Sequence, residues 1–229
     1  MIGTIEFATE HKWVGETWDP EHTKSIIENR LKNKSKTFTG AYIITNQGIK
    51  APKSEVVVDN FLKPIWENKK ALGKTAIEHS SLQKMHQELS KHRGWGGGGF
   101  MSYEVVTDLN YTSVLEKATD KMAWANAGPG AVRGLNRIHN RKLEKALKQD
   151  QCNIEMRDLL LFGKENSYIK SVVLKNININ DIDMRTIEHS LCEWDKYERV
   201  RLGQGRPRSK YKAESSLFAT NEFKKGTVK

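Results

Sequence analysis

The chain has 229 residues, of which 37% are apolar and 29% are charged, and this composition is typical of a globular protein that buries a core. Its 38 lysines and arginines exceed its 28 aspartates and glutamates, and the net charge of +10 favours a polyanionic partner. No apolar run approaches the roughly 20 residues that span a bilayer, and the first residues lack the pattern of a secretory signal. The two cysteines are too few for a disulfide framework and fit a reducing cytoplasm.

The N-terminal half reads as a series of helices. Asp19-Pro20-Glu21 combines a capping side chain, a proline at the first helical position and an early acid, so it predicts a helix start. Residues 38–45 fit either a short strand or a buried helical turn. A helix is expected over 54–66, with Pro64 kinking or interrupting it. An amphipathic helix is expected over 75–91.

A glycine-rich loop, Gly94-Trp-Gly-Gly-Gly-Gly-Phe100, separates this half from the next. It is either a connection between subdomains or a loop that lies close to a ligand, with Trp95 or Phe100 available for stacking. No Lys-Ser or Lys-Thr follows the glycines, so a P-loop kinase is not expected.

The second half predicts further helices and one basic loop. The helices are expected over 100–109, 112–118, 130–148, 156–162 and 187–200, the last one introduced by Asp181-Ile-Asp183, and the basic loop over 203–208. The fold class is therefore mainly α with few short strands. We expect one helical domain over 1–212, a possible subdomain break near 93–99, and a loosely ordered tail over 213–229.

The segment from Trp124 to Arg137 contains a Gly-Pro-Gly turn before a helix that carries arginines. Gly128 and Gly130 allow close approach of another molecule, and a helix N-terminus presents free N–H groups to an anion. In a basic chain, a nucleic-acid phosphate suits this position. The alternative is an ordinary tight turn between two packed helices.

Two basic segments flank a more neutral stretch, and we expect them to form the walls of a groove. The first is 133–148, and the second, 196–212, carries seven cations against one glutamate. Their cations include Arg133, Arg137, Arg141, Lys142, Lys145, Lys148, Lys196, Arg199, Arg201, Arg206, Arg208, Lys210 and Lys212.

The expected helix over 187–200 also carries candidate catalytic groups. Helical spacing aligns His189, Glu193 and Lys196, and a second row contains Glu188, Cys192 and Asp195. Such a line suits general acid–base work or activation of an amine. The alternative is a salt-bridged surface. In either case we expect Leu191, Trp194 and Tyr197 to face the core.

Asp108 is a third candidate, since it either caps a following helix or points into a pocket shared with Asn126. Metal binding has little support, because the sequence has no Cys-x-x-Cys or His-Glu-x-x-His pattern. It also has no Gly-x-Ser-x-Gly elbow of a serine hydrolase.

Three motifs occur in the same order as in a known family: Phe100-Met-Ser-Tyr-Glu-Val-Val-Thr-Asp-Leu109, Trp124-Ala-Asn-Ala-Gly-Pro-Gly-Ala-Val-Arg-Gly-Leu135 and Glu188-His-Ser-Leu-Cys-Glu-Trp-Asp-Lys-Tyr197. The chain thus resembles phage proteins of DNA base hypermodification. These include the amino acid:DNA transferases (α-glutamyl/putrescinyl thymine pyrophosphorylases) and the helical domain of hydroxymethyluracil DNA kinases. Phe38-Thr-Gly-Ala-Tyr-Ile-Ile44 also fits, so the resemblance covers about residues 35–212.

The resemblance implies a fold like that of helix-hairpin-helix DNA glycosylases, with the Gly-Pro-Gly turn as a clamp on the DNA backbone. It also implies a pyrophosphorylated thymine methyl in DNA, from which an amino acid or polyamine displaces pyrophosphate. The kinase domain of the family is missing here, so a separate kinase would act first, in the cytoplasm of the host cell. No cofactor is expected, although a divalent metal could help pyrophosphate to leave.

This chemistry suggests roles for the candidate residues, since the target base is expected to flip out of the duplex. Trp124 or Trp95 would stack on the base and Asn126 would read its edge. Cations at Arg133, Arg137, Lys196 and Arg199 would hold pyrophosphate. Glu188, His189 or Glu193 would take the proton of the amine. Two other functions stay open: a DNA glycosylase, and a non-catalytic DNA-binding module.

Overall fold

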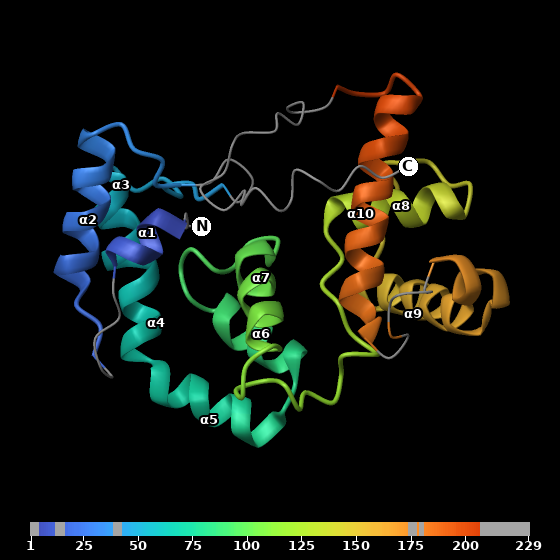
Figure 1. The fold of residues 1–229 in the computed structure, drawn as a ribbon, viewed down its shortest axis with the longest axis horizontal. Coiled ribbons are helices and arrows are strands. Elements are labelled where there is room, and N and C mark those ends of the chain that lie inside the picture. The colour runs from blue at the N-terminus through green and yellow to red at the C-terminus, as the bar shows by residue number, and fades with distance from the viewer. Residues whose placement is uncertain (1–4, 12–16, 39–42, 174–177, 179–180, 207–229) are drawn as a thin grey trace, which may run out of the picture.

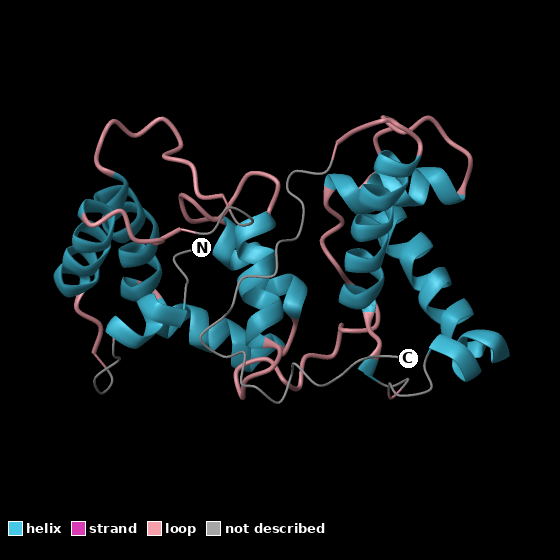
Figure 2. Ribbon diagram, turned by 45° about the horizontal axis from the view of Figure 1, so that its top comes forward, coloured by secondary structure: helices cyan, strands magenta, loops and turns pink. Residues whose placement is uncertain are grey.

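The computed structural model describes residues 5–11, 17–38, 43–173, 178 and 181–206, and these residues form helices joined by loops, with no strand among them (Figures 1 and 2). The expectation of a mainly α fold is confirmed. Every helix in this part of the chain is too short or too polar to cross a bilayer.

The N-terminal group of helices lies at the left of Figure 1. It consists of α1 (Ile5–Glu10), α2 (Pro20–Lys32), α3 (Lys53–Glu55), the π-helical η1 (Val56–Leu62) and α4 (Lys63–Glu67). The predicted start of α2 is confirmed: the Asp19 carboxylate accepts hydrogen bonds from the N–H groups of Glu21 and His22. These bonds satisfy N–H groups that the first turn of a helix leaves free.

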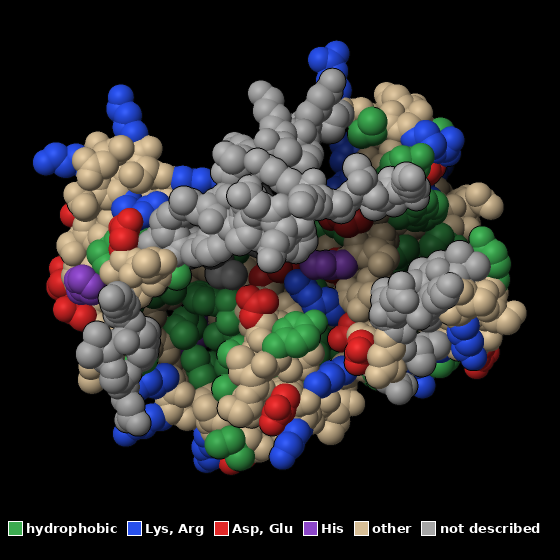
Figure 3. Space-filling model, in the orientation of Figure 1, with side chains coloured by type: hydrophobic (Ala, Val, Ile, Leu, Met, Phe, Trp, Pro, Cys, Tyr) green, Lys and Arg blue, Asp and Glu red, His purple; other side chains and the backbone are tan. Residues whose placement is uncertain are grey.

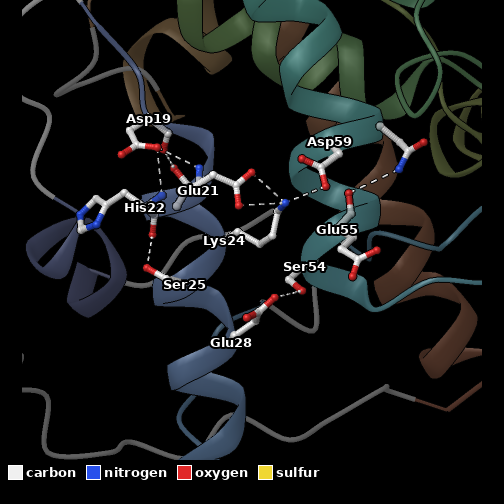
Figure 4. A network of polar contacts seen from close by, with 11 residues as sticks. Asp19, Glu21, His22, Lys24, Ser25, Glu28, Ser54, Glu55 and Asp59 are labelled. Atoms are coloured by element: carbon white, nitrogen blue, oxygen red, sulfur yellow. Dashed lines mark hydrogen bonds and ion pairs between the residues drawn. The ribbon is translucent and has the colours of Figure 1, made fainter.

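A polar network on the surface joins α2 to α3 and η1 (Figure 4). Lys24 Nζ lies 2.9 Å from Asp59 Oδ2 and 3.0 Å from Glu21 Oε1. Ser54 Oγ donates to Glu28 Oε1 over 2.9 Å. These contacts link two helices whose apolar faces pack through Ile27 and Val58.

The predicted helix over 54–66 is present, and the effect of Pro64 on it is visible. Helical backbone runs from Lys53 to Glu67 through α3, η1 and α4. Pro64 has no N–H to donate and its ring crowds the preceding turn. The backbone accommodates it with a π-type segment, in which the Lys63 N–H donates to the carbonyl of Val58, five residues earlier.

The prediction of a single helix over 75–91 is wrong, because the structure has two helices there. They are α5 (Lys69–His79) and α6 (Leu82–Ser90), and Ser80 between them adopts φ +42°. Asp120 holds this break from a distant loop, since its carboxylate accepts from Ser81 Oγ and from the N–H groups of Leu82 and Gln83. A contact 37 to 39 residues away in sequence cannot be read from helical periodicity.

The remaining helices are α7 (Phe100–Leu109), α8 (Pro129–Ile138), α9 (Gln149–Glu165), η2 (Ile169–Val173) and α10 (Met184–Arg201). The predictions over 100–109 and 187–200 are confirmed, and Asp183 forms a capping box with Thr186. The predicted helix over 156–162 covers only the middle of α9. The one over 112–118 is wrong, because this segment forms turns around the buried Leu115.

The helix expected over 130–148 is also too long, because α8 ends at Ile138. Asn140 adopts φ +49°, and the following chain turns back. The fully buried Asn136 side chain donates to the carbonyls of Leu143 and Lys145, so it holds this return in place.

The main core joins α5 to α10 and includes Leu89, Val106, Leu135, Met156 and Met184. It therefore continues on both sides of the glycine loop. Trp95 of that loop is buried, and its Nε1 donates to the carbonyl of Phe61 over 2.8 Å. In Figure 1, α6 and α7 stand between the N-terminal helices and the group formed by α8, α9 and α10.

Candidate active site and nucleic-acid interface

Helices α8 and α10 cross closely because two glycines of α8 lack side chains. A Cβ on Gly130 would lie 2.4 Å from Cys192 Sγ, and one on Gly134 would lie 2.9 Å from the carbonyl oxygen of Leu191. Both distances are shorter than a carbon atom tolerates. These glycines therefore serve the contact between the helices, which supports the packing interpretation of the Gly-Pro-Gly segment.

The N-terminus of α8 receives a carboxyl group from the chain itself. Gly128 N–H donates to Glu188 Oε1 over 3.2 Å, and the Glu188 side chain is buried against the turn. Burial raises the pKa of Glu188, although the Gly128 hydrogen bond and the nearby His189 and Arg185 act in the opposite direction. Glu188 is thus a desolvated carboxyl group with a raised affinity for a proton.

A second carboxylate lies next to this one. Glu104 of α7 is buried, its Oε2 accepts from Arg185 Nη2 over 3.1 Å, and its Oε1 lies 3.9 Å from His189 Nε2. Burial would raise the pKa of Glu104, but the contacts with His189 and Arg185 outweigh it and the pKa is lowered. Two neighbouring carboxyl groups therefore have pKa values shifted in opposite directions, which is a common feature of acid–base sites.

Buried aromatic rings close the inner side of this cluster. Trp124 is only 8% exposed, and its ring meets Tyr103 edge-on, with 5.6 Å between centroids. The structure thus gives Trp124 a core position in place of the open stacking surface that we expected. Within the described residues, the buried Tyr103 Oη and Arg185 Nη1 have no hydrogen-bond partner.

Asn126 and Asp108 lie at different ends of α7. Asn126 Nδ2 donates to the carbonyl of Gly98, just before the helix. Asp108 is exposed in its last turn, about 12 Å further along the axis. The structure therefore does not bring Asp108 into a pocket with Asn126 or into the Glu188 cluster.

The arginines of α8 are held by a buried carboxylate of α10. Asp195 is fully buried, and it accepts from Arg133 Nε over 2.7 Å and from Arg137 Nε over 3.0 Å. These three residues, Arg133, Arg137 and Asp195, form a triad that keeps one net positive charge. Glu193 and Lys196 pair with each other on the exposed face of α10, as the surface interpretation of this helix predicts.

The two basic segments do come together, around an open hollow of about 420 Å³. It is lined by Arg137, Asn140, Arg141, Trp194 and Glu198. The prediction that Trp194 and Tyr197 face the core is wrong, since their exposed fractions are 36% and 63%. The buried residues of α10 are Met184, Glu188, Leu191 and Asp195.

The other predicted cations lie near the end of α10. The guanidinium of Arg199 lies over Gly205, and Arg206 is exposed. Arg208 is outside the described residues. Among the residues that the structure describes, no group of three or more histidine, cysteine, aspartate or glutamate side chains is arranged to hold a metal ion.

Sequence reasoning missed Glu104, Arg185 and the role of Asp195. The sequence could have indicated Glu104 as a buried polar residue, because it is an acid inside the largely apolar segment 100–107. Asp195 lies seven residues after Glu188, which places both on one face of α10. Figure 3 shows a histidine with acidic and basic side chains beside it in the middle of the viewed face.

The fold and the site define a helical protein with a buried acid–base cluster beside a basic surface. The family described as "5-hmdU DNA kinase, helical domain" matches residues 4–206 of the chain. The chain therefore belongs to this family, which associates it with enzymes that modify bases in DNA. No curated protein and no solved structure matches it.

Proposed function

We propose that this protein is a transferase of thymine hypermodification in phage DNA. Its substrate would be a 5-hydroxymethyluracil base whose exocyclic oxygen carries pyrophosphate, made beforehand by a separate kinase. The co-substrate would be an amino acid or a polyamine. The observation that carries the proposal is the pair of buried carboxyl groups, Glu188 and Glu104, in a chain of this family.

The reaction needs a proton acceptor next to the reacting carbon. The amine nitrogen forms a bond to the exocyclic methylene carbon while the carbon–oxygen bond to pyrophosphate breaks, and pyrophosphate leaves with the bonding electrons. The amine must lose one proton. Glu188 suits this step because burial raises the pKa of its carboxyl group, so it holds a proton better than a solvated glutamate.

The remaining groups around Glu188 suit the binding of the leaving group. Arg185 is the cation closest to the carboxylate pair: it donates to Glu104, and its guanidinium lies 5.3 Å from the centroid of the Tyr103 ring. Arg185 is therefore the first candidate to hold the pyrophosphate oxygens, and the triad of Arg133, Arg137 and Asp195 adds a positive charge further along α10.

The decisive experiment supplies DNA with pyrophosphorylated 5-hydroxymethyluracil, the protein and a panel of amines. Nucleosides are then analysed by mass spectrometry and released pyrophosphate is measured. We expect an amine adduct and one pyrophosphate per modified base. Glu188→Gln should lower the rate about 10²- to 10⁴-fold, the usual contribution of a general base. Glu193→Gln, on the exposed face of the same helix, is the matched control and should keep the rate.

Other outcomes would refute the proposal in distinguishable ways. Release of the free base with an abasic site would identify a glycosylase, in which a buried acid stabilises charge on the sugar. DNA binding without any change in the bases, in the wild type and in Glu188→Gln alike, would identify a non-catalytic module. Full activity of Glu188→Gln would remove Glu188 from the mechanism and leave His189 as the next candidate base.

A further inference from the structure

The hollow beside α10 lies between the most basic parts of the described chain. Residues 133–148 and 195–206, which border it, contain ten lysines and arginines against three acids. The acid that lines the hollow, Glu198, is already paired with Arg201 through two hydrogen bonds of 2.8 and 2.7 Å. Glu155, which pairs with Arg141, is a fourth acid, and ten cations still outnumber these four, so the local charge is positive and attracts a polyanion.

The cations at the hollow are held in fixed positions before any ligand arrives. Arg137 donates to the buried Asp195 and to Gln204 Oε1 over 2.7 Å. Arg141 donates from Nη1 to Glu155 over 2.8 Å. A side chain that is already ordered loses little conformational entropy when it binds a partner.

Among the residues that the structure describes, Trp194 is the only aromatic side chain that lines this hollow, and it is accessible. Its exposed fraction is 36%, against 8% for both Trp95 and Trp124. An exposed indole next to ordered guanidinium groups combines a stacking surface for a base with donors for its phosphates. This combination is typical of surfaces that bind single-stranded or extruded nucleotides.

We propose that the hollow binds a nucleotide of the DNA strand that flanks the nucleotide processed at Glu188. The base stacks on Trp194, and Arg137 and Arg141 hold its phosphates. Trp194 follows Glu188 by six residues, about 9 Å along the α10 axis and roughly 120° around it, so the strand would pass around the helix to place one nucleotide at the carboxylates and its neighbour at Trp194. The inference rests on the proposed function, because it takes DNA as the substrate.

The test compares the binding of a short single-stranded oligonucleotide to the full chain and to three variants. Trp194→Ala should weaken binding roughly tenfold, as loss of one base stack does. Trp194→Phe should keep most of the affinity because it keeps a ring. Tyr197→Ala is the matched control: this side chain is more exposed, lies one turn further along α10 and does not line the hollow. It should bind like the wild type.

Tryptophan fluorescence supplies a readout that does not depend on affinity. Addition of the oligonucleotide should quench the wild type more strongly than Trp194→Phe, and circular dichroism should show that all variants are folded. Equal affinity of Trp194→Ala and wild type would overturn the proposal, and so would equal quenching of Trp194→Phe. If amine transfer persists in either case, only the flanking site is refuted. If the wild type neither binds DNA nor transfers an amine, the proposed function falls as well.

Discussion

Both ends of the described chain use carboxylates and cations to join helices, but they do so in different surroundings. In the N-terminal group, Lys24 meets Asp59 and Glu21 at the surface, where the Glu21 side chain is 77% exposed (Figure 4). At the crossing of α8 and α10, Asp195 is fully buried between Arg133 and Arg137. Removal of one partner from an ion pair in water costs little stability, whereas removal of one partner from a buried pair leaves the other charge desolvated and unpaired.

The comparison predicts its largest effect at Asp195. Asp195→Ala leaves two arginines of α8 without the carboxylate that holds them, and loss of one partner of a buried ion pair costs about 3–5 kcal/mol. Urea unfolding measures this cost. The control is Glu193→Ala, which breaks an exposed pair on the same helix and should change the stability by less than about 0.5 kcal/mol. Equal costs would show that the Asp195 triad is not a structural anchor.

The close crossing of α8 and α10 predicts the next effect. Gly134→Ala places a Cβ 2.9 Å from the carbonyl oxygen of Leu191, so the helices must move apart, at a cost of about 1–3 kcal/mol. Gly163→Ala is the matched control in α9, where the added carbon meets nothing within 4 Å. It should stabilise the protein by about 0.5–1 kcal/mol. Thermal unfolding of both variants gives the comparison, and a stabilised Gly134→Ala would contradict the close contact.

The two carboxyl groups of the candidate active site predict opposite pH dependences. The folded state raises the pKa of Glu188 above its ordinary 4.5, so the stability that protonated Glu188 contributes is complete below that value and is lost as the pH rises through the raised pKa. The folded state lowers the pKa of Glu104, so its contribution is present above 4.5 and is lost as the pH falls through the lowered pKa.

Substitution by glutamine separates these two cases. As the pH rises above 4.5, Glu188→Gln should gain stability relative to the wild type, because only the wild type loses the contribution of a protonated Glu188. As the pH falls below 4.5, Glu104→Gln should gain stability relative to the wild type, because only the wild type loses the contribution of the Glu104 carboxylate. Urea unfolding at a series of pH values measures both. Parallel curves for the two variants would show that the carboxyl groups share one environment.

The smallest effect is expected in the N-terminal network. The hydrogen bonds to Asp59 and Glu21 raise the pKa of Lys24, but the two carboxylates are open to water, with side-chain exposures of 35% and 77%. Lys24→Met should therefore lower the melting temperature less than Gly134→Ala does, and the difference from the wild type should shrink in high salt because exposed ion pairs are screened. A large, salt-independent loss would mean that this network is as important as the Asp195 triad.

Helix boundaries that depend on contacts between residues close in sequence could be predicted, and boundaries that depend on distant contacts could not. Asp19 and Asp183 cap helices through neighbours two or three residues away. The start of α2 is therefore correctly predicted, and the segment Asp181-Ile-Asp183 is correctly predicted to introduce α10, although this helix begins three residues before the predicted range. The break between α5 and α6 depends on Asp120, and the end of α8 depends on the buried Asn136. Those contacts are made by the folded chain, and periodicity alone therefore extended both helices too far.

The candidate site, too, could be predicted only in part from the sequence. The sequence drew attention to Glu188 and to the Gly128 turn, but it offered Glu193, Lys196 and Trp124 on equal terms. The structure separates them, because it leaves the Glu193–Lys196 pair in solvent and places Trp124 in the core. Asn126 and Asp108 lie at opposite ends of α7, which residue spacing between separate helices could not reveal.

The sequence by itself determined the helical class, the strong positive charge and the residues of the family motifs, because composition, local capping and motif order are properties of neighbouring residues. Only the tertiary structure decided which charged groups are buried and which meet. Gly128 and Glu188 are 60 residues apart, and Glu104 and Arg185 are 81 apart. Their protonation and pairing depend on the desolvation that helix packing imposes, and no local pattern carries that information.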